Sequence, residues 1–281
     1  MRTWRTHGDR RWITGAVAVV AVVGTIIAIA IGLAAGTPPE KPLATPSGAS
    51  RIPPIVASGV APLSVPLIHA GLAPGKAILT SMVDSLSVFD APDGAVTRSL
   101  GQYTYYSRPL TLMAIDAIEA DGNTWYEVSL PAKPNGQTGW VRASEVIVSS
   151  TDTVIHVYLA QHELDVVVGG AVELTAPVAV GSPKTPTPLG TFYITDPIDL
   201  SANPTGVYGA YALGLSAYSE ALDSFKGTIP QIAIHGTNVP GSIGQSVSNG
   251  CIRMQNDAVR DLGGRVGIGT PVIVSAARPE A

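Results

Sequence analysis

The residues best suited to chemistry lie in one stretch, Ile234 to Met254, which reads IHGTNVPGSIGQSVSNGCIRM. It contains Cys251, the only cysteine of the chain, and His235 lies sixteen positions before it. A cysteine that transfers acyl groups needs a histidine within hydrogen-bond reach and backbone N–H groups that face the developing oxyanion. The glycine- and serine-rich segment between the two residues can turn sharply and bring Cys251 back beside His235. The pattern therefore allows nucleophilic catalysis by a thiol.

The immediate neighbours of Cys251 favour a site over a structural thiol. Free cysteine is among the most buried residue types, so a lone Cys and a lone His more often have structural roles. Here, however, Gly250 lets the backbone approach a substrate closely, and Arg253 can hold a carboxylate in a forked grip. Because a buried structural thiol seldom lies between a glycine-rich loop and an arginine, we expect an acyl-transfer site.

The elements that must position this stretch are mostly predicted strands. Residues 153–275 consist of apolar or alternating runs joined by turn residues, and QIAIHG is a strand that ends at His235. One helix is predicted over NDAVRDLGG, with Asn256 as N-cap and Gly263-Gly264 at its end. Residues 76–149 show only short β-rich runs between Asp-Gly, Asn-Gly and Pro turns. The expected fold is mainly β: a small β-barrel, then a β-rich domain with one or two short helices.

The N-terminus predicts a membrane anchor. Residues 12–35 carry no charge, and at ~1.5 Å rise per residue they can cross the ~30 Å hydrocarbon core of a bilayer. Four arginines precede this segment, whereas the next charges after it are Glu40 and Lys41. Residues 1–11 are therefore expected to be cytoplasmic and everything after residue 36 extracytoplasmic. A cleaved signal peptide is the alternative, although the apolar run exceeds the ~7–15 residues of a signal core. Residues 36–75 are rich in proline and predict a linker.

Composition excludes several classes of protein. The net charge of −4 gives no electrostatic footprint for nucleic acid. A single cysteine excludes an intramolecular disulfide and any multi-cysteine zinc site. His156 and His162 could be read as metal ligands, but no further ligand is evident near them, so structural roles are expected. We therefore expect neither a metal nor a cofactor.

Two parts of the chain resemble known families. HGTNVPGSIGQSVSNGCIRM is similar to the active-site segment of the YkuD-type L,D-transpeptidases, and PTPLGTFYI, from Pro186 to Ile194, resembles another element of that family. This resemblance covers residues 153–275. The earlier run DGNTWYEVSLPAKPNGQTGWV resembles the bacterial SH3-like modules found beside cell-wall enzymes, which implies a binding or positioning module over 76–149. A spacer domain in which Trp125 and Trp140 only fill a core remains the alternative.

The first resemblance implies a reaction in peptidoglycan biosynthesis. Cys251 would attack a tetrapeptide stem before its terminal D-Ala, and the thioester would pass to an amine of a neighbouring stem as a 3-3 crosslink. His235 would be the base, oriented by the carbonyl of Gly236. The substrate site would be lined by Thr237, Ser248, Asn249, Gly250 and Arg253. Many members carry histidine at the position of Asn249, which cannot titrate, so pH dependence or substrate preference is expected to differ.

The same resemblance implies partners and a location. Peptidoglycan tetrapeptide stems would be the substrates, and carbapenem-type β-lactams would acylate Cys251. The enzyme would act on the cell-wall side of the cell membrane, in cell-wall organization and the maintenance of cell shape. L,D-carboxypeptidase activity, with water as acceptor, and a non-catalytic cell-wall-binding protein remain alternatives. A cysteine peptidase is disfavoured, because such enzymes place the cysteine before the histidine and no histidine follows Cys251.

Overall fold

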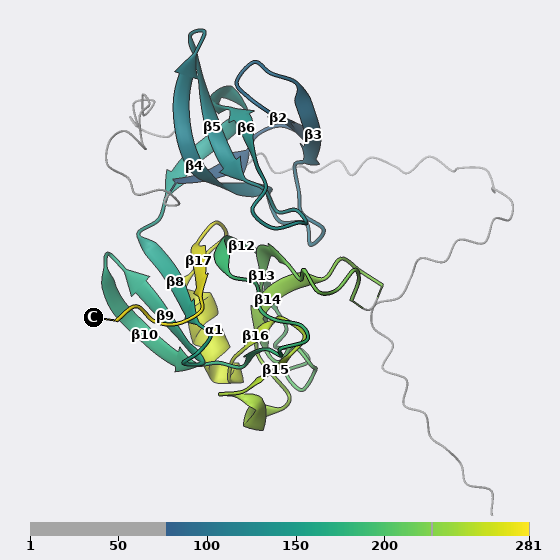
Figure 1. Ribbon diagram of the computed structural model, residues 1–281, viewed down its shortest axis with the longest axis vertical. Helices are drawn as coiled ribbons and strands as arrows, with labels where there is room; N and C mark the ends of the chain where they lie inside the picture. The colour runs from purple at the N-terminus through teal and green to yellow at the C-terminus, as the bar shows by residue number, and fades with distance from the viewer. Residues whose placement is uncertain (1–76, 226, 281) are drawn as a thin grey trace, which may run out of the picture. The chain divides into compact units, whose positions relative to one another are not determined.

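The computed structural model describes residues 77–225 and 227–280, as the coloured ribbon of Figure 1 shows. The predicted tail (1–11), membrane-spanning helix (12–35) and linker (36–75) lie outside these residues and stay predictions. Within the described ranges, no helix is both long and apolar enough to cross a bilayer. The described chain is mainly β, as predicted, and contains two separate large sheets.

The first sheet is antiparallel, with its strands in the order β3-β2-β6-β5-β4-β1-β7. Its strands are β1 (Ala77–Ser81), β2 (Ser85–Phe89), β3 (Val96–Gly101), β4 (Thr111–Ala120), β5 (Asn123–Ser129), β6 (Thr138–Arg142) and β7 (Val146–Ser150), and a short 3-10 turn, Ala143–Glu145, precedes β7. Trp125 is fully buried in its interior and meets Phe89 edge to face at 5.0 Å. Trp140 is only half-buried. The β-rich prediction for 76–149 is therefore confirmed, and at least one tryptophan fills a core.

The second sheet has the strand order β10-β9-β8-β17-β12-β13-β14-β16, and β11 and β15 form a separate parallel pair. The strands are β8 (Thr153–Tyr158), β9 (Glu163–Val168), β10 (Ala171–Pro177), β11 (Val180–Gly181), β12 (Gly190–Asp199), β13 (Tyr211–Tyr218), β14 (Gln231–His235), β15 (Ser246–Ser248), β16 (Ile252–Arg253) and β17 (Pro271–Ser275). A 3-10 turn, Pro240–Ser242, lies between β14 and β15. Large aliphatic side chains from most of these strands form one buried core.

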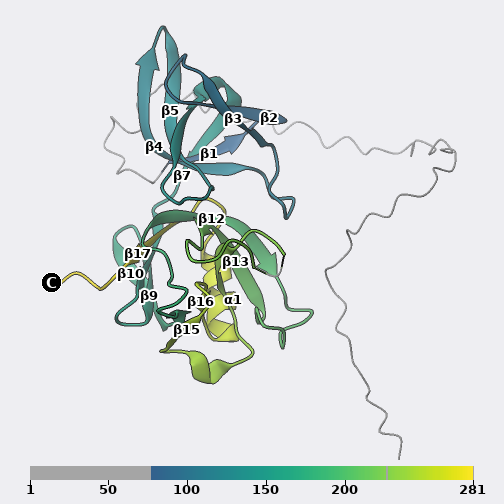
Figure 2. The same ribbon diagram turned by 45° about the vertical axis from the view of Figure 1, so that its right-hand side comes forward.

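Helix α1 (Asn256–Arg265) contacts β13 and β14, and its Val259 and Leu262 are buried. Figure 2 shows α1 beside β13. The existence of this helix was predicted, but both of its predicted ends are wrong. Gln255 holds the N-cap position without a side-chain cap. Asn256 is the first residue of the helix, and its side-chain oxygen accepts from the Thr237 N–H. Gly263 lies inside the helix, where a Cβ would come within 2.6 Å of the Tyr211 ring. The glycine therefore serves close packing and does not end the helix.

Candidate active site

Strand register brings Cys251 toward His235. Strands β14 and β16 are parallel, with Ile234 opposite Ile252 and His235 opposite Arg253. Cys251, one residue before β16, therefore lies beside Ala233, and the thiol has a hydrogen bond with the Ala233 backbone. Ala233 and His235 are two residues apart on one strand, so they face the same side of the sheet. The thiol and the imidazole consequently share a face.

His235 is buried and its orientation is fixed. Its Nδ1 lies 2.5 Å from the carbonyl oxygen of Gly236, and because a carbonyl can only accept, Nδ1 carries the proton and Nε2 has a free lone pair. The ring also meets the Tyr208 ring edge to face at 5.0 Å. Burial lowers the pKa of His235 to about 4, against hydrogen bonds to the backbone of Gly236 and Tyr208, which raise it. The imidazole is therefore neutral at neutral pH and can accept a proton.

Cys251 is partly exposed at the end of a tight turn. Burial raises the pKa of its thiol, although the Ala233 backbone and the charge of Arg253 act in the opposite direction. Within the described residues no hydrogen bond joins the thiol to His235, and in unliganded enzymes such bonds are often long until substrate binds. Both groups are therefore neutral at rest, and the thiol has to lose its proton during attack, with the imidazole as acceptor.

The turn that carries Cys251 is closed by Ser248 and Gly250. The Ser248 hydroxyl is buried, donates to the carbonyl of Cys251 at 2.5 Å and accepts from the Gly250 N–H at 3.1 Å. Gly250 has a φ of +111°, which only glycine adopts readily, and a Cβ there would lie 2.9 Å from Ile232 Cδ1. Asn249 is exposed at the turn. The predicted substrate roles of these three residues stay predictions, since the Ser248 and Gly250 contacts serve the turn itself.

Thr187, which lies far from the Cys251 turn in sequence, supports this turn by a direct hydrogen bond. The sequence did not reveal this role. The buried hydroxyl of Thr187 donates to the carbonyl of Gly250 at 2.8 Å and accepts from the Gly181 N–H at 2.9 Å. Thr185 donates in the same way to the carbonyl of Ser248 at 3.1 Å. The family resemblance marks the PTPLG run only as a family element. The hydrogen bonds show that Thr187, the threonine of this run, joins Gly181 to Gly250.

Asn256 is a second residue whose role was missed. Its side-chain oxygen accepts from the N–H groups of Ala210 and Thr237 at 3.2 and 3.1 Å, and its amide donates to Pro204 at 3.3 Å. The side chain thus joins the start of α1 to the loop after β12 and to the segment that follows His235. It stands next to Gly236, where an added Cβ would lie 2.2 Å from the Asn256 oxygen.

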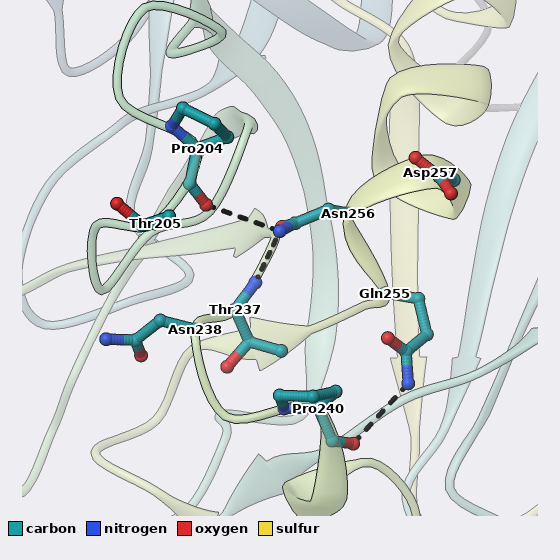
Figure 3. A pocket seen from close by; sticks show the side chains of 8 residues that line it. All are labelled: Pro204, Thr205, Thr237, Asn238, Pro240, Gln255, Asn256 and Asp257. Carbon is teal, nitrogen blue, oxygen red and sulfur yellow. Dashed lines mark hydrogen bonds between the residues drawn. The ribbon is translucent and has the colours of Figure 1, made fainter.

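Figure 3 shows the contacts of Asn256 with Thr237 and Pro204, beside a pocket of about 490 Å³. Its lining includes Thr237, Asn238, Gln255 and Asn256, but neither Cys251 nor His235. The Thr237 side chain accepts a hydrogen bond from the Val239 N–H at 3.0 Å. We refer to Cys251 and His235 as the reactive pair. The pocket is lined by residues close to this pair in sequence, but it does not contain the pair itself.

Arg253 is available to bind an anion. Its Nε is buried without a hydrogen-bond partner, and none of the ion pairs formed by the described residues includes its guanidinium. Its positive charge adds to the lowering of the His235 pKa and opposes the rise of the Cys251 pKa that burial causes. The prediction that Arg253 grips a substrate carboxylate is compatible with this environment.

The histidines considered as metal ligands lie apart from this site. The His156 ring stacks on Tyr158 with centroids 6.0 Å apart, and His162 Nε2 lies 2.9 Å from the Ser246 hydroxyl. Among the described residues, no three His, Cys, Asp or Glu side chains gather in a way that could hold a metal ion. Both histidines thus have contacts of a structural kind.

The fold and the site together define a β-sheet protein with a cysteine and a neutral histidine on one face, the arrangement of acyl-transfer sites. Comparison with known proteins gives the family. A family model described as the L,D-transpeptidase catalytic domain, YkuD, matches residues 152–274. A Bacillus subtilis protein named as the L,D-transpeptidase YkuD is 35% identical over 167 residues, which cover 57% of this chain and 93% of the relative.

A Bacillus licheniformis protein of the same name is 36% identical over 168 residues, with the same coverage of 57% and 93%. Among solved structures, L,D-transpeptidase 3 from Mycobacterium tuberculosis is 16% identical, with a TM-score of 0.38, and the match covers 54% of this chain and 91% of that chain. The chain belongs to the L,D-transpeptidase family. The predicted family is confirmed.

Proposed function

We propose that the protein is a cysteine-dependent peptidoglycan L,D-transpeptidase that makes 3-3 crosslinks. Membership of the family supports transpeptidation of peptidoglycan in general. The observation that carries the finer proposal is the hydrogen bond from His235 Nδ1 to the Gly236 carbonyl, because it leaves Nε2 free on the face that Cys251 shares. Thiol attack assisted by a neutral base fits this arrangement better than a preformed ion pair does.

In the first half of the reaction, Cys251 Sγ attacks the carbonyl carbon of the diamino acid at the third position of a tetrapeptide stem. His235 Nε2 takes the thiol proton as the C–S bond forms, and backbone N–H groups of the turn at Gly250 and Cys251 stabilise the oxyanion. The intermediate collapses with cleavage of the C–N bond. The imidazolium returns its proton to the amine of the departing D-Ala, which leaves a thioester on Cys251.

In the second half, a side-chain amine of a neighbouring stem attacks the thioester carbon. His235 accepts a proton from this amine, the C–S bond breaks and the thiolate of Cys251 is reprotonated. Arg253 holds a stem carboxylate, supported by its unpaired Nε. Thr237, Ser248 and Asn249 complete the walls of the substrate site. Transfer to water in place of the amine would be the L,D-carboxypeptidase reaction.

We also propose that carbapenem-type β-lactams acylate Cys251. A β-lactam is a strained cyclic amide, so thiol attack opens the ring and leaves the drug bound as a thioester. The enzyme would be anchored by residues 12–35 and would act on the cell-wall side, with residues 76–149 as an SH3-like positioning module. A non-catalytic wall-binding protein is the second candidate, and it would require neither His235 nor Cys251.

The test is incubation of the full chain with purified disaccharide-tetrapeptides, followed by mass spectrometry of the products. Crosslinked dimers with loss of one D-Ala are expected. Loss of D-Ala without dimers would assign the carboxypeptidase reaction, and unchanged substrate would overturn the enzymatic proposal.

A further inference from the structure

The loop between β3 and β4, residues 102–109, presents three tyrosines to solvent; we refer to it as the tyrosine loop. Tyr103, Tyr105 and Tyr106 are 60%, 82% and 47% exposed. The Tyr105 and Tyr106 rings meet edge to face with centroids 5.1 Å apart. Large apolar side chains gathered at one surface commonly mark a binding site.

The backbone of the tyrosine loop is held in one conformation. The Thr104 N–H donates to the carbonyl of Arg108 at 2.8 Å, and the Ser107 N–H donates to the carbonyl of Thr104 at 2.9 Å. Tyr103 and Pro109 pair as an isolated antiparallel bridge at its base. A loop closed by its own hydrogen bonds presents its side chains with little ordering cost on binding.

Two hydrogen bonds fasten the tyrosine loop to β12. The hydroxyl of Thr104 donates to the buried carboxylate of Asp196, and the guanidinium of Arg108 donates to the carbonyl of Pro197 at 3.0 Å. The neighbouring residue of β12, Ile198, pairs with Ala212 of β13, and Ala212 pairs with His235 of β14. The point on β12 where the tyrosine loop is attached and the His235 backbone are therefore two strand spacings of ~4.8 Å apart, a distance of about 10 Å.

Tyr208 contacts His235 and lies within electrostatic reach of the tyrosine loop. It is 38% exposed and its ring contacts that of His235. Burial raises the pKa of Tyr208, and the nearby Cys251 and Tyr106 groups raise it further. Tyr208 thus lies near both Cys251 and Tyr106.

We propose that Tyr105 and Tyr106 bind the sugar that carries the donor stem. This inference rests on the proposed transpeptidase function. Three residues of an extended stem separate the sugar-bearing end from the scissile bond, and at ~3.3–3.6 Å per residue they span about 10 Å. That span matches the distance from His235 to the attachment point of the tyrosine loop. Exposed tyrosines combine an apolar ring face with a hydroxyl, which suits a sugar with C–H faces and a polar rim.

The experiment compares two donors with the full-length protein: a disaccharide-tetrapeptide, and the same tetrapeptide after removal of the sugars. Release of D-Ala gives kcat/KM for each donor. The wild type should prefer the sugar-bearing donor by about tenfold, the size expected for ~1.4 kcal/mol of aromatic contact. The double variant Tyr105→Ala/Tyr106→Ala should bring this ratio close to one, whereas Tyr105→Phe/Tyr106→Phe should keep it.

Ile147→Ala is the matched control, because this side chain is 57% exposed on β7 of the same sheet and should leave the ratio unchanged. Equal turnover of both donors by the wild type would overturn the sugar site but leave the transpeptidase intact. A uniform loss on both donors in the double alanine variant would also overturn it, since the rings would then serve the peptide or the fold. Absence of D-Ala release from either donor would refute the proposed function itself.

Discussion

Replacement of Asn256 by alanine should weaken both the fold and the reactive pair. Its side-chain oxygen is the acceptor for the N–H groups of Ala210 and Thr237. A buried donor left without a partner costs about 1–3 kcal/mol. Because Asn256 is only half-buried, water can relieve part of this cost, and we expect a total loss of about 2 kcal/mol in the free energy of unfolding.

The Asn256→Ala substitution should also disturb the position of the His235 ring. The Gly236 carbonyl that orients the imidazole lies immediately before Thr237, whose N–H is held by Asn256. Freedom in this segment lets the ring leave the productive tautomer and position, and small displacements of a base are costly in rate. We expect acylation of Cys251 by a carbapenem to slow about tenfold, a cost of ~1.4 kcal/mol in the barrier.

Two measurements check this prediction: denaturant unfolding, and the rate of adduct formation followed by intact mass. Asn256→Asp keeps the oxygen that accepts from Ala210 and Thr237 and places a negative charge in the first turn of α1, but it loses the donor to Pro204. It should therefore lose less stability than Asn256→Ala. Asp257→Ala removes only an exposed ion pair with Arg260 and should be nearly neutral. If Asn256→Ala unfolds and reacts like Asp257→Ala, the positioning role of Asn256 is wrong.

Three other substitutions probe the site. His235 has a pKa of about 4 in the folded protein and ~6.5 in the unfolded chain, so the unfolded chain takes up the proton first as pH falls. The free energy of unfolding should therefore decrease by about 3 kcal/mol between pH 6.5 and pH 4. Denaturant unfolding of His235→Gln at both pH values should not show this decrease. Thr187→Val should lose about 2 kcal/mol, because the N–H of Gly181 and the carbonyl of Gly250 lose their partner; an unchanged denaturation midpoint would contradict this. Gly250→Ala should lower the free energy of unfolding by about 2 kcal/mol, because alanine is strained at a φ of +111°. It should also slow acylation of Cys251, which quenched time points measured by intact mass can determine.

The sequence could predict the strands and the return of Cys251 toward His235 because both have local signals. Alternating apolar residues predicted β14, and the glycine-rich loop before Cys251 predicted a return to its edge. The role of Asn256 could not be predicted, since a polar residue before a helix is expected to cap it, whereas the amide here binds Ala210, which is 46 residues away. Thr187 meets Gly250 across 63 residues, and no periodic pattern reports such a contact.

The electrostatic state of the pair was also beyond the sequence. A neutral histidine with a pKa of about 4 results from nearly complete burial of the ring, which depends on Tyr208 and on the packing of the sheet. The family resemblance implied the Gly236 carbonyl as the orienting group, and the hydrogen bond from Nδ1 is present in the structure. The position of the tyrosine loop beside β12 could be known only from the hydrogen bonds that Thr104 and Arg108 donate to Asp196 and Pro197.

The nucleophile can be tested by rapid quenching of the full chain with a disaccharide-tetrapeptide and measurement of the intact protein mass. If the thiol of Cys251 is the acyl carrier and His235 its base, the wild type gains the mass of the disaccharide-tripeptide acyl group, that is, the donor without its last alanine. His235→Ala would then form this adduct far more slowly, and Cys251→Ala would not form it at all. Crosslinked product from Cys251→Ala at the rate of the wild type would show that another group carries the acyl chain.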